Sequence, residues 1–294
     1  MIVVTTPTGQ IGHQVLEDLL RHTDSVRAIV RDPARLPPQT RERIEIVKGS
    51  HGDADVVNKA FAGADSVFWL VPPDPHAKSA DAAYVDFSRP ACTAFKTHGI
   101  KRVVGISALG RGTLAAEHAG LVTASFKMDD LIASTGVHYR AVTNPSFMDN
   151  LLRQVEAIKT QSMFALPISG DLKQPSACTR DIAATAAKLL LDQTWNGVGS
   201  VPVLGPEDLS YNDMARIMSE VLGKAVRFQE IPGEAFKARL LQRGMSEAMA
   251  QATLDMWVAY GQGLDTAERR TPQSTTPTSF RQWCSEELKP RVTA

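Results

Sequence analysis

The chain has 294 residues, 22% of them charged, and a formal net charge of +0, which is typical of an ordinary soluble globular protein. This balance indicates neither a basic nucleic-acid-binding surface nor an acidic tail, so we expect no nucleic-acid partner. No secretory signal, membrane-spanning run, CxxC pair or zinc motif is visible, and we expect a cytoplasmic protein without membrane contact or a metal site.

The first half of the chain alternates short apolar runs with segments of helical periodicity. The predicted strands are Ile2–Thr5, Val26–Val30, Ile44–Val47, Ser66–Val71, Arg102–Ser107 and His138–Thr143. The predicted helices between them cover residues 11–20, Val56–Ala62, Ala80–Thr97 and Ala116–Ser134. Strands joined by such helices predict an α/β fold with a doubly wound parallel sheet, here a Rossmann-type dinucleotide-binding domain over residues 1–145.

The pattern changes after Asn144 and Pro145, and residues 146–294 are expected to form a smaller C-terminal α/β substrate domain. Elements of the chain are allowed to cross between the two domains. The predicted helices are Phe147–Lys159, Asp181–Asp192, Leu209–Leu222 with Gly223 as its C-cap, Glu234–Gly263 with a break near Gly244, and Phe280–Leu288. The run Ala165–Ile168 is followed by a turn at Gly170 and Asp171. A strand is expected at Val201–Leu204, and an extended loop over Thr266–Ser279.

A phosphate-binding loop is predicted between the first strand and the first helix. Backbone N–H groups at a helix N-terminus can bind a pyrophosphate, and glycines let the backbone approach it closely. The expected contacts come from Thr6, Thr8, Gly9, Gln10, Ile11 and Gly12. Thr6 stands where the usual pattern has its first glycine, and Pro7 removes one N–H group. The alternative is a tight strand–helix turn without a ligand.

Arg31 directly follows the second strand, where the adenine ribose of a dinucleotide is usually held. A guanidinium there can pair with the 2′-phosphate of NADP, whereas a carboxylate would hold the 2′-hydroxyl of NAD. We therefore expect NADP(H) to be preferred over NAD(H), with Asp32 as the competing signal and a solvated Arg31 as the alternative. Asp53, after the third strand, is expected at the adenine, at the N-cap of the next helix, or in both roles.

The nicotinamide end of the cofactor is predicted at the carboxyl ends of two later strands. The expected contacts are Val71 and Pro72 after the fourth strand, and Asn144, Pro145, Ser146 and Phe147 after the sixth. Phe147 and Met148 are candidates for an apolar substrate pocket, although helix packing explains them nearly as well. Trp257 and Tyr260 are at helical spacing and are interpreted as core, with a pocket role as the alternative.

Several longer stretches resemble the NmrA-like family of atypical short-chain dehydrogenases/reductases. The resemblance covers nearly the whole chain and includes TPTGQIG from Thr6, ISALG from Ile106, YRAVTNPSFMDNLL from Tyr139, DIAATAAKLL from Asp181 and VLGPEDLSYNDMARIMSEVLGK from Val203. It implies a cofactor domain with a small substrate domain. Members of this family include NAD(P)H-dependent quinone and dye reductases as well as an NADP-sensing regulator.

The resemblance also directs attention to Ser107 and Lys127. Short-chain dehydrogenases generally use a serine at a strand end and a Tyr-x-x-x-Lys pair on the next helix, and here Thr123 occupies the tyrosine position. Lys127 is the candidate catalytic residue and, with Ser107, a candidate cofactor contact. A threonine is too weak an acid for ketone reduction near neutral pH.

Two functional hypotheses follow. The first is NADPH-dependent reduction of a small aromatic or conjugated acceptor such as a quinone, with protons taken from water. The second is a non-catalytic NADP(H)-binding redox sensor. The sequence leaves open whether the chain forms a homo-oligomer.

Overall fold

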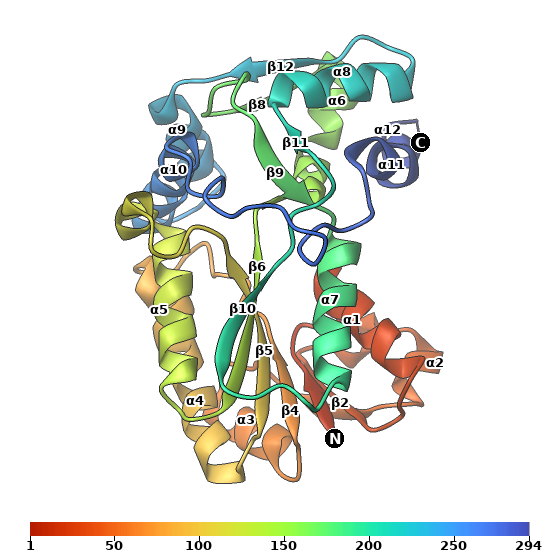
Figure 1. The fold of residues 1–294 in the computed structure, drawn as a ribbon, viewed down its shortest axis with the longest axis vertical. Helices are drawn as coiled ribbons and strands as arrows, with labels where there is room; N and C mark the ends of the chain where they lie inside the picture. The colour runs from red at the N-terminus through yellow and green to blue at the C-terminus, as the bar shows by residue number, and fades with distance from the viewer. Residues whose placement is uncertain (294) are drawn as a thin grey trace.

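A computed structural model describes residues 1–293. Its centre is a seven-stranded sheet with strand order β10-β6-β5-β4-β1-β2-β3, and every pairing within it is parallel (Figure 1). The strands are β1 Ile2–Val4, β2 Val26–Val30, β3 Glu45–Lys48, β4 Ser66–Trp69, β5 Arg102–Ala108, β6 His138–Asn144 and β10 Val198–Pro202. This sheet confirms the predicted Rossmann-type α/β fold, and its carboxyl edge carries the candidate site.

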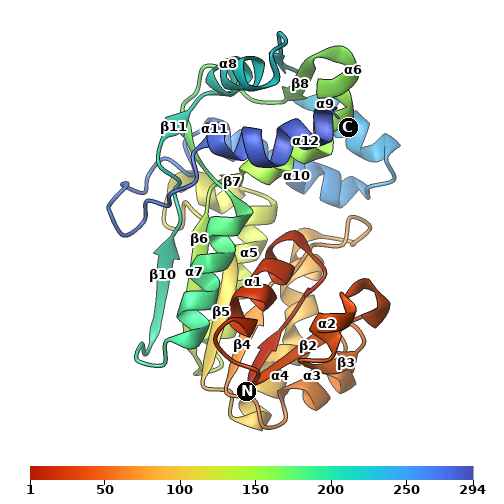
Figure 2. The ribbon, with the colours of Figure 1, turned by 90° about the vertical axis from the view of Figure 1, so that its right-hand side faces the viewer.

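Helices cover both faces of the central sheet. On one face α1 (Gln10–Leu20) packs beside α7 (Thr179–Leu191), and the two helices run next to each other in Figure 2. The other face is covered by α3 (Ala54–Phe61), α4 (Phe87–His98) and α5 (Leu121–Ala133). The strands are apolar because both faces are buried, as in other doubly wound sheets.

The chain returns to the central sheet after residue 145. Both α7 and the edge strand β10 come from the predicted C-terminal half, and β10 pairs with β6 along the whole of β10. The short connections of the first half are η1 (Pro33–Arg35), α2 (Pro38–Arg41), the π-turn η2 (Ala82–Asp86) and the 3₁₀ turn η3 (Leu114–His118). The domain boundary at residue 145 stays a prediction, because these elements cross it.

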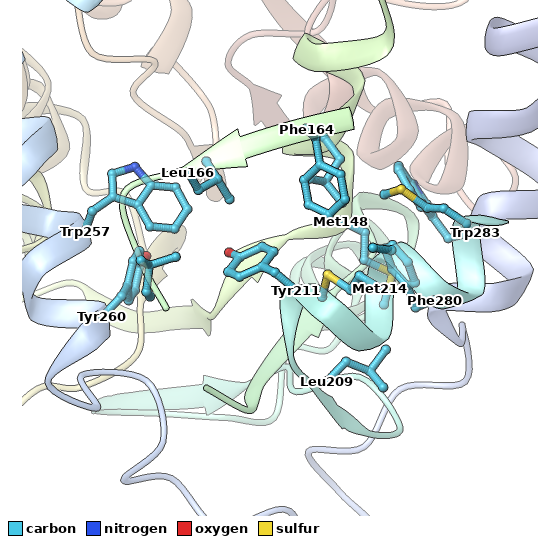
Figure 3. Packing of buried hydrophobic residues seen from close by; sticks show 14 of the residues in the cluster. Met148, Phe164, Leu166, Leu209, Tyr211, Met214, Trp257, Tyr260, Phe280 and Trp283 are labelled. Atoms are coloured by element: carbon cyan, nitrogen blue, oxygen red, sulfur yellow. The ribbon is translucent and has the colours of Figure 1, made fainter. Parts of the chain in front are cut away.

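Above the carboxyl edge lies a group of small sheets and helices (Figure 1). One sheet has the order β11-β9-β7, and another pairs β12 with β8. The strands are β7 Ser146–Phe147, β8 Met163–Leu166, β9 Gln174–Ala177, β11 Asp208–Leu209 and β12 Arg227–Glu230. The helices are η4 Met148–Gln154, α6 Val155–Gln161, α8 Tyr211–Leu222, α9 Gly233–Gln242, α10 Glu247–Gly261, α11 Phe280–Trp283, η5 Cys284–Leu288 and α12 Lys289–Thr293. Their shared aromatic core is drawn in Figure 3.

Residues 262–279, which we call the strap, run across the carboxyl edge of the central sheet. The Leu204 N–H after β10 donates to Ser274 O at 2.8 Å. The Asp181 carboxylate on α7 accepts hydrogen bonds from the Thr278 N–H and hydroxyl groups at 3.0 and 2.8 Å. The strap matches the predicted loop over Thr266–Ser279, and it joins the two halves of the molecule.

Three predicted elements are wrong in their extent. Phe147–Lys159 is not one helix, because Ser146–Phe147 pairs with β9 as strand β7 before the chain turns into η4 and α6. The predicted helix Ala116–Ser134 is interrupted at Gly120, whose φ of +54° is a left-handed conformation. A Cβ at Gly120 would overlap the backbone of Ala252 on α10, so close packing requires glycine there.

The third error is the edge strand predicted at Val201–Leu204, which begins three residues earlier and ends two residues earlier, at Val198–Pro202. The breaks at Gly223 and Gly244 are confirmed: Gly223 ends α8 in a left-handed conformation, and α9 and α10 lie on either side of Gly244. None of the helices within residues 1–293 is long and apolar enough to cross a membrane.

Candidate functional site

The loop after β1 has the backbone shape of an anion-binding turn. Thr6 adopts a φ of +52°, the left-handed region that glycine favours, and its carbonyl accepts a hydrogen bond from the Gly9 N–H at 2.9 Å. A Cβ at Gly12 would overlap this carbonyl, whereas a Cβ at Gly9 would lie 3.4 Å from it. Gly12 therefore allows α1 to pack against the loop, whereas a Cβ at Gly9 would make only ordinary van der Waals contact with Thr6.

The N-terminus of α1 provides the donors of this loop. Gly9 is the N-cap and makes no side-chain cap hydrogen bond. The first N–H groups of a helix have no partner in the helix itself, and they carry the positive end of its dipole. The N–H groups of Gln10, Ile11 and Gly12 are thus placed to receive a pyrophosphate, and the Thr8 side chain lies in the same turn.

Arg31 and Asp32 differ sharply in what they contact. The Asp32 carboxylate accepts a hydrogen bond from the Ala34 N–H at 3.1 Å and caps η1, so this carboxylate is already engaged. Arg31 is exposed, and within residues 1–293 its guanidinium forms neither an ion pair nor a side-chain hydrogen bond. Of the two, Arg31 is the group free to bind a phosphate.

His51 lies beside this corner and was not singled out from the sequence. Its imidazole packs against the rings of Trp69 and Phe87, and Nε2 donates to Leu70 O at 3.0 Å. Burial, opposed by the hydrogen bond to Leu70 and assisted by the nearby Arg31 charge, lowers the His51 pKa to about 4, so the ring is neutral at neutral pH. Asp53 is the N-cap residue of α3 but its side chain makes no cap hydrogen bond, which leaves the carboxylate exposed.

The remaining cofactor candidates lie at the same edge of the sheet. Val71 is buried and Pro72 exposed in the segment after β4, which neighbours β1 in the sheet. Asn144 ends β6 opposite Ala108, and Pro145 behind it is buried. Since the carboxyl ends of parallel strands share one edge, these residues lie along one line with the phosphate loop.

Asn144 presents a buried acceptor without a partner. Its Nδ2 donates to Val142 O at 2.7 Å and to Ser107 O at 3.1 Å, which fixes the orientation of the amide. Its Oδ1 is buried and receives no hydrogen bond from any residue between 1 and 293. Such an oxygen is costly unless a donor reaches it, and the carboxamide of a nicotinamide ring is one such donor.

Ser107 does not point toward free space. Its hydroxyl donates to Asp129 Oδ2 at 2.5 Å, and the Tyr139 hydroxyl donates to Asp129 Oδ1 at 2.6 Å. Arg111 closes the cluster through an ion pair with Asp129 at 3.3 Å. Burial raises the Asp129 pKa to about 6, although these donors oppose the shift. Ser107 is thus part of the contact between α5 and the sheet, and its role toward a cofactor stays a prediction.

Lys127 and Thr123 lie on the other side of α5. Asp129 faces the sheet, and a residue two positions earlier on an α-helix points about 200° away from it. Lys127 is exposed and pairs with Asp81 at 2.7 Å, and the Thr123 hydroxyl donates to Ala116 O at 2.8 Å. Both residues line an open groove of about 500 Å³ between α5 and α10. The catalytic role of Lys127 therefore stays a prediction, and the side of α5 on which it lies does not favour that role.

A second, apolar pocket follows directly from Asn144 and Pro145. Its enclosed space is small, about 40 Å³ against the 500 Å³ of the groove, and it reaches about 470 Å³ only when the open solvent at its mouth is included. It is lined by Ser146, Phe147, Met148, Asn150, Leu151, Gln154, Leu166, Gln174, Pro175, Ser176, Leu209, Tyr211, Met214 and Trp257. Figure 3 shows the Tyr211 hydroxyl directed toward Trp257 and Tyr260. Trp257 has both of its expected roles, since it belongs to the core and also lines the pocket.

The residues at this edge fit a dinucleotide. The fit rests on the left-handed turn at Thr6, the uncapped N-terminus of α1, the free Arg31 guanidinium and the unpartnered Asn144 oxygen. No group of three or more His, Cys, Asp or Glu side chains within residues 1–293 is arranged to hold a metal ion.

Comparison with known proteins agrees with this fold. An NAD(P)H azoreductase from Xenophilus azovorans is 28% identical over 257 residues, covering 87% of this chain and 86% of the relative. Quinone oxidoreductase 2 from Escherichia coli is 25% identical, covering 90% and 89%. An NADPH-dependent quinone oxidoreductase from Escherichia coli, solved in complex with NADPH, superposes with a TM-score of 0.80 at 23% identity, covering 97% of this chain and 99% of that chain. The model of the NmrA-like family matches residues 1–275, and the chain belongs to this family.

Proposed function

We propose that the chain is an NADPH-dependent reductase of quinone-like or other conjugated small molecules. The observation that carries the proposal is the free Arg31 guanidinium at the end of β2, beside an uncapped helix N-terminus, while the competing Asp32 carboxylate is engaged in capping η1. The relatives support the same class of reaction, since they are named as an NAD(P)H azoreductase and a quinone oxidoreductase.

In this proposal the residues of the chain bind the cofactor and the acceptor and orient them toward each other. The N–H groups of Gln10 to Gly12 hold the pyrophosphate, Arg31 pairs with the 2′-phosphate, and Asn144 Oδ1 accepts from the carboxamide. NADPH supplies the hydride when it is bound. The pocket of Phe147, Tyr211 and Trp257 then holds the acceptor at the end of β6.

The class of molecule that is reduced follows from the absence of a phenolic acid on α5. Thr123 offers no phenolic acid, and its hydroxyl is already used to hold η3. Simple ketones need an acid to protonate the alkoxide formed, whereas the reduced form of a conjugated acceptor can take its protons from water. We therefore propose conjugated rather than simple carbonyl substrates.

Titration of NADPH and NADH against the wild type and Arg31→Ala tests the cofactor part of the proposal. A charge-assisted contact of about 1.5–3 kcal/mol predicts roughly 10- to 150-fold tighter binding of NADPH than of NADH, and Arg31→Ala should remove most of the difference. Arg41→Ala is the matched control, because Arg41 is an exposed arginine on α2. Equal affinities in the wild type would contradict the assignment of Arg31.

A non-catalytic NADP(H) sensor is the second candidate. Lys127 and Thr123, the expected catalytic positions, are engaged by Asp81 and Ala116 on the far side of α5, which favours this reading. A sensor should bind NADPH tightly, oxidise it with no acceptor, and change its affinity for a partner by different amounts with NADP⁺ and NADPH.

A further inference from the structure

The polar wall of the apolar pocket is formed by Gln174 and Tyr211. Gln174 is 6% exposed and comes from the central strand of the three-stranded sheet β11-β9-β7. Its Nε2 donates to Tyr260 O at 2.8 Å and to Asp265 Oδ1 at 3.2 Å. Because both partners are acceptors, only the amide nitrogen can face them, and the orientation of the amide is fixed.

The amide oxygen of Gln174 is consequently left for a ligand. Gln174 Oε1 receives no hydrogen bond from any residue between 1 and 293, and the residue lines the pocket. A ligand that brings a hydrogen-bond donor to an unpaired acceptor beside an apolar cavity is stabilised by the new hydrogen bond.

Tyr211 supplies the opposite kind of group. Burial raises the pKa of its phenol above the ordinary value, although a hydrogen bond with the Ser146 side chain opposes the shift, so the hydroxyl stays protonated. Ser146 lines the same pocket, and a ligand acceptor shares or replaces its contact with the hydroxyl. The pocket is otherwise formed largely by apolar and aromatic side chains, among them Phe147, Leu166 and Trp257. It thus combines one fixed acceptor and one donor with surfaces on which a ring can stack.

We propose that this pocket binds flat aromatic compounds that carry a hydroxyl or amino group, and that Gln174 selects for that group. Hydroxyquinones and amino-substituted azo compounds belong to this class. The ligand donor binds Gln174 Oε1, and its conjugated carbonyl or azo nitrogen accepts from Tyr211. This inference refines the substrate class of the proposed function and rests on it for its relevance, but the binding it describes requires no turnover.

Asp265, on the strap, acts as a positioning residue for Gln174. Its side chain is 1% exposed, and Oδ2 has no hydrogen-bond partner among residues 1–293. Burial raises the Asp265 pKa to about 7, and the charge of Asp208 on β11 contributes. The other ionisable groups nearby are Tyr211, Tyr260 and Arg270, which pairs with Asp208. An ionised Asp265 holds the amide of Gln174 more firmly than a neutral one.

Binding of β-naphthol and of its methyl ether tests the proposal without any redox reaction. Calorimetric titration should show that the wild type binds β-naphthol about threefold to tenfold more tightly than its methyl ether, because only the free hydroxyl can donate to Gln174. Gln174→Met should bind both ligands equally. Equal affinities in the wild type would overturn the proposal whether or not the variant folds, and whether or not the protein oxidises NADPH.

The role of Asp265 has its own readout. In the wild type the preference for β-naphthol should increase between one pH unit below and one unit above the Asp265 pKa. Asp265→Asn keeps an acceptor oxygen but does not titrate, and its preference should be the same at both pH values. A preference in the wild type that does not change with pH, or a variant that keeps the pH dependence, would remove Asp265 from the proposal.

Discussion

Thr6 is the residue at which this chain departs most clearly from the usual phosphate loop. It is a β-branched residue at a φ of +52°, where the left-handed conformation costs roughly 1–2 kcal/mol. Its Oγ1 is also buried and finds no hydrogen-bond partner among residues 1–293. Thr6 thus adopts a backbone conformation that favours glycine, which indicates that the surrounding structure holds the turn in place.

Replacing Thr6 by glycine should therefore stabilise the protein. We expect Thr6→Gly to raise the free energy of unfolding by about 1 kcal/mol, after the extra entropy of glycine in the unfolded chain is subtracted. Urea unfolding measures this change. Thr8→Gly is the matched control and should lower stability, because Thr8 has no positive φ to relieve. A destabilised Thr6→Gly variant would show that the threonine side chain makes a compensating contact.

Asp265 should make stability depend on pH. The folded-state pKa of about 7 lies above the ordinary value of 3.8, so the folded protein retains a proton that the unfolded chain has lost. The contribution of Asp265 to stability should consequently be greatest below about pH 4 and fall as the pH rises toward 7. The Asp265→Asn variant does not titrate and so does not lose this stability. The difference in free energy of unfolding between variant and wild type should therefore be more favourable to the variant at pH 8 than at pH 4, by on the order of 2 to 4 kcal/mol. A gain of equal size at both pH values would contradict the buried, protonated carboxyl.

Among the helices, α1 meets the phosphate loop at two glycines with different expected roles. Gly12 is needed for the packing of α1, and Gly9 for the binding of the cofactor. A Cβ at Gly12 would overlap the Thr6 carbonyl, while one at Gly9 would lie in ordinary van der Waals contact with it, at 3.4 Å. Gly12→Ala should cost about 1–3 kcal/mol of stability, because α1 must move away from the loop. Gly9→Ala should fold with nearly unchanged stability but bind NADPH more weakly.

Thermal unfolding combined with NADPH titration tests both variants. A Gly12→Ala protein as stable as the wild type would show that α1 moves freely. A Gly9→Ala protein that binds NADPH normally would indicate that the turn is structural and does not approach the cofactor.

Helices and strands with strong apolar periodicity could be predicted from the sequence. Those whose conformation depends on contacts with distant segments could not. The central sheet, α1, α7 and α8 follow from apolar spacing and glycine caps. Strand β7 could not be read from residues 146–147, because its strand character depends on pairing with β9, far along the chain. The direction of Lys127 was missed for a related reason: only the contacts of Asp129 with Ser107 and Tyr139 reveal which face of α5 meets the sheet.

The site was predictable to a similar degree. The phosphate loop and Arg31 have local signatures, and the structure places them together at the carboxyl edge. His51, Gln174 and Asp265 have none, because their importance arises from burial and from partners distant in sequence. A buried glutamine in a short strand cannot be distinguished from an ordinary one before its amide partners are known.

At the scale of the whole molecule, the two halves are expected to unfold together. The strap, α7 and β10 all cross between them, and the Asp181 carboxylate on α7 holds the strap through both groups of Thr278. Asp181→Ala should lower the transition temperature while a single calorimetric transition remains, since loss of a buried acceptor leaves the Thr278 groups unpaired. Two separate transitions in the wild type would contradict this coupling.

Steady-state oxidation of NADPH with a panel of acceptors is the decisive test of the proposal that NADPH bound at this edge reduces conjugated acceptors. We predict turnover with menadione and with an amino-substituted azo dye, and much slower turnover with simple ketones, because α5 offers no phenolic acid. Rapid reduction of simple ketones would show that another residue supplies the proton. Tight NADPH binding without oxidation by any acceptor would contradict the reductase and leave the sensor as the function of the site.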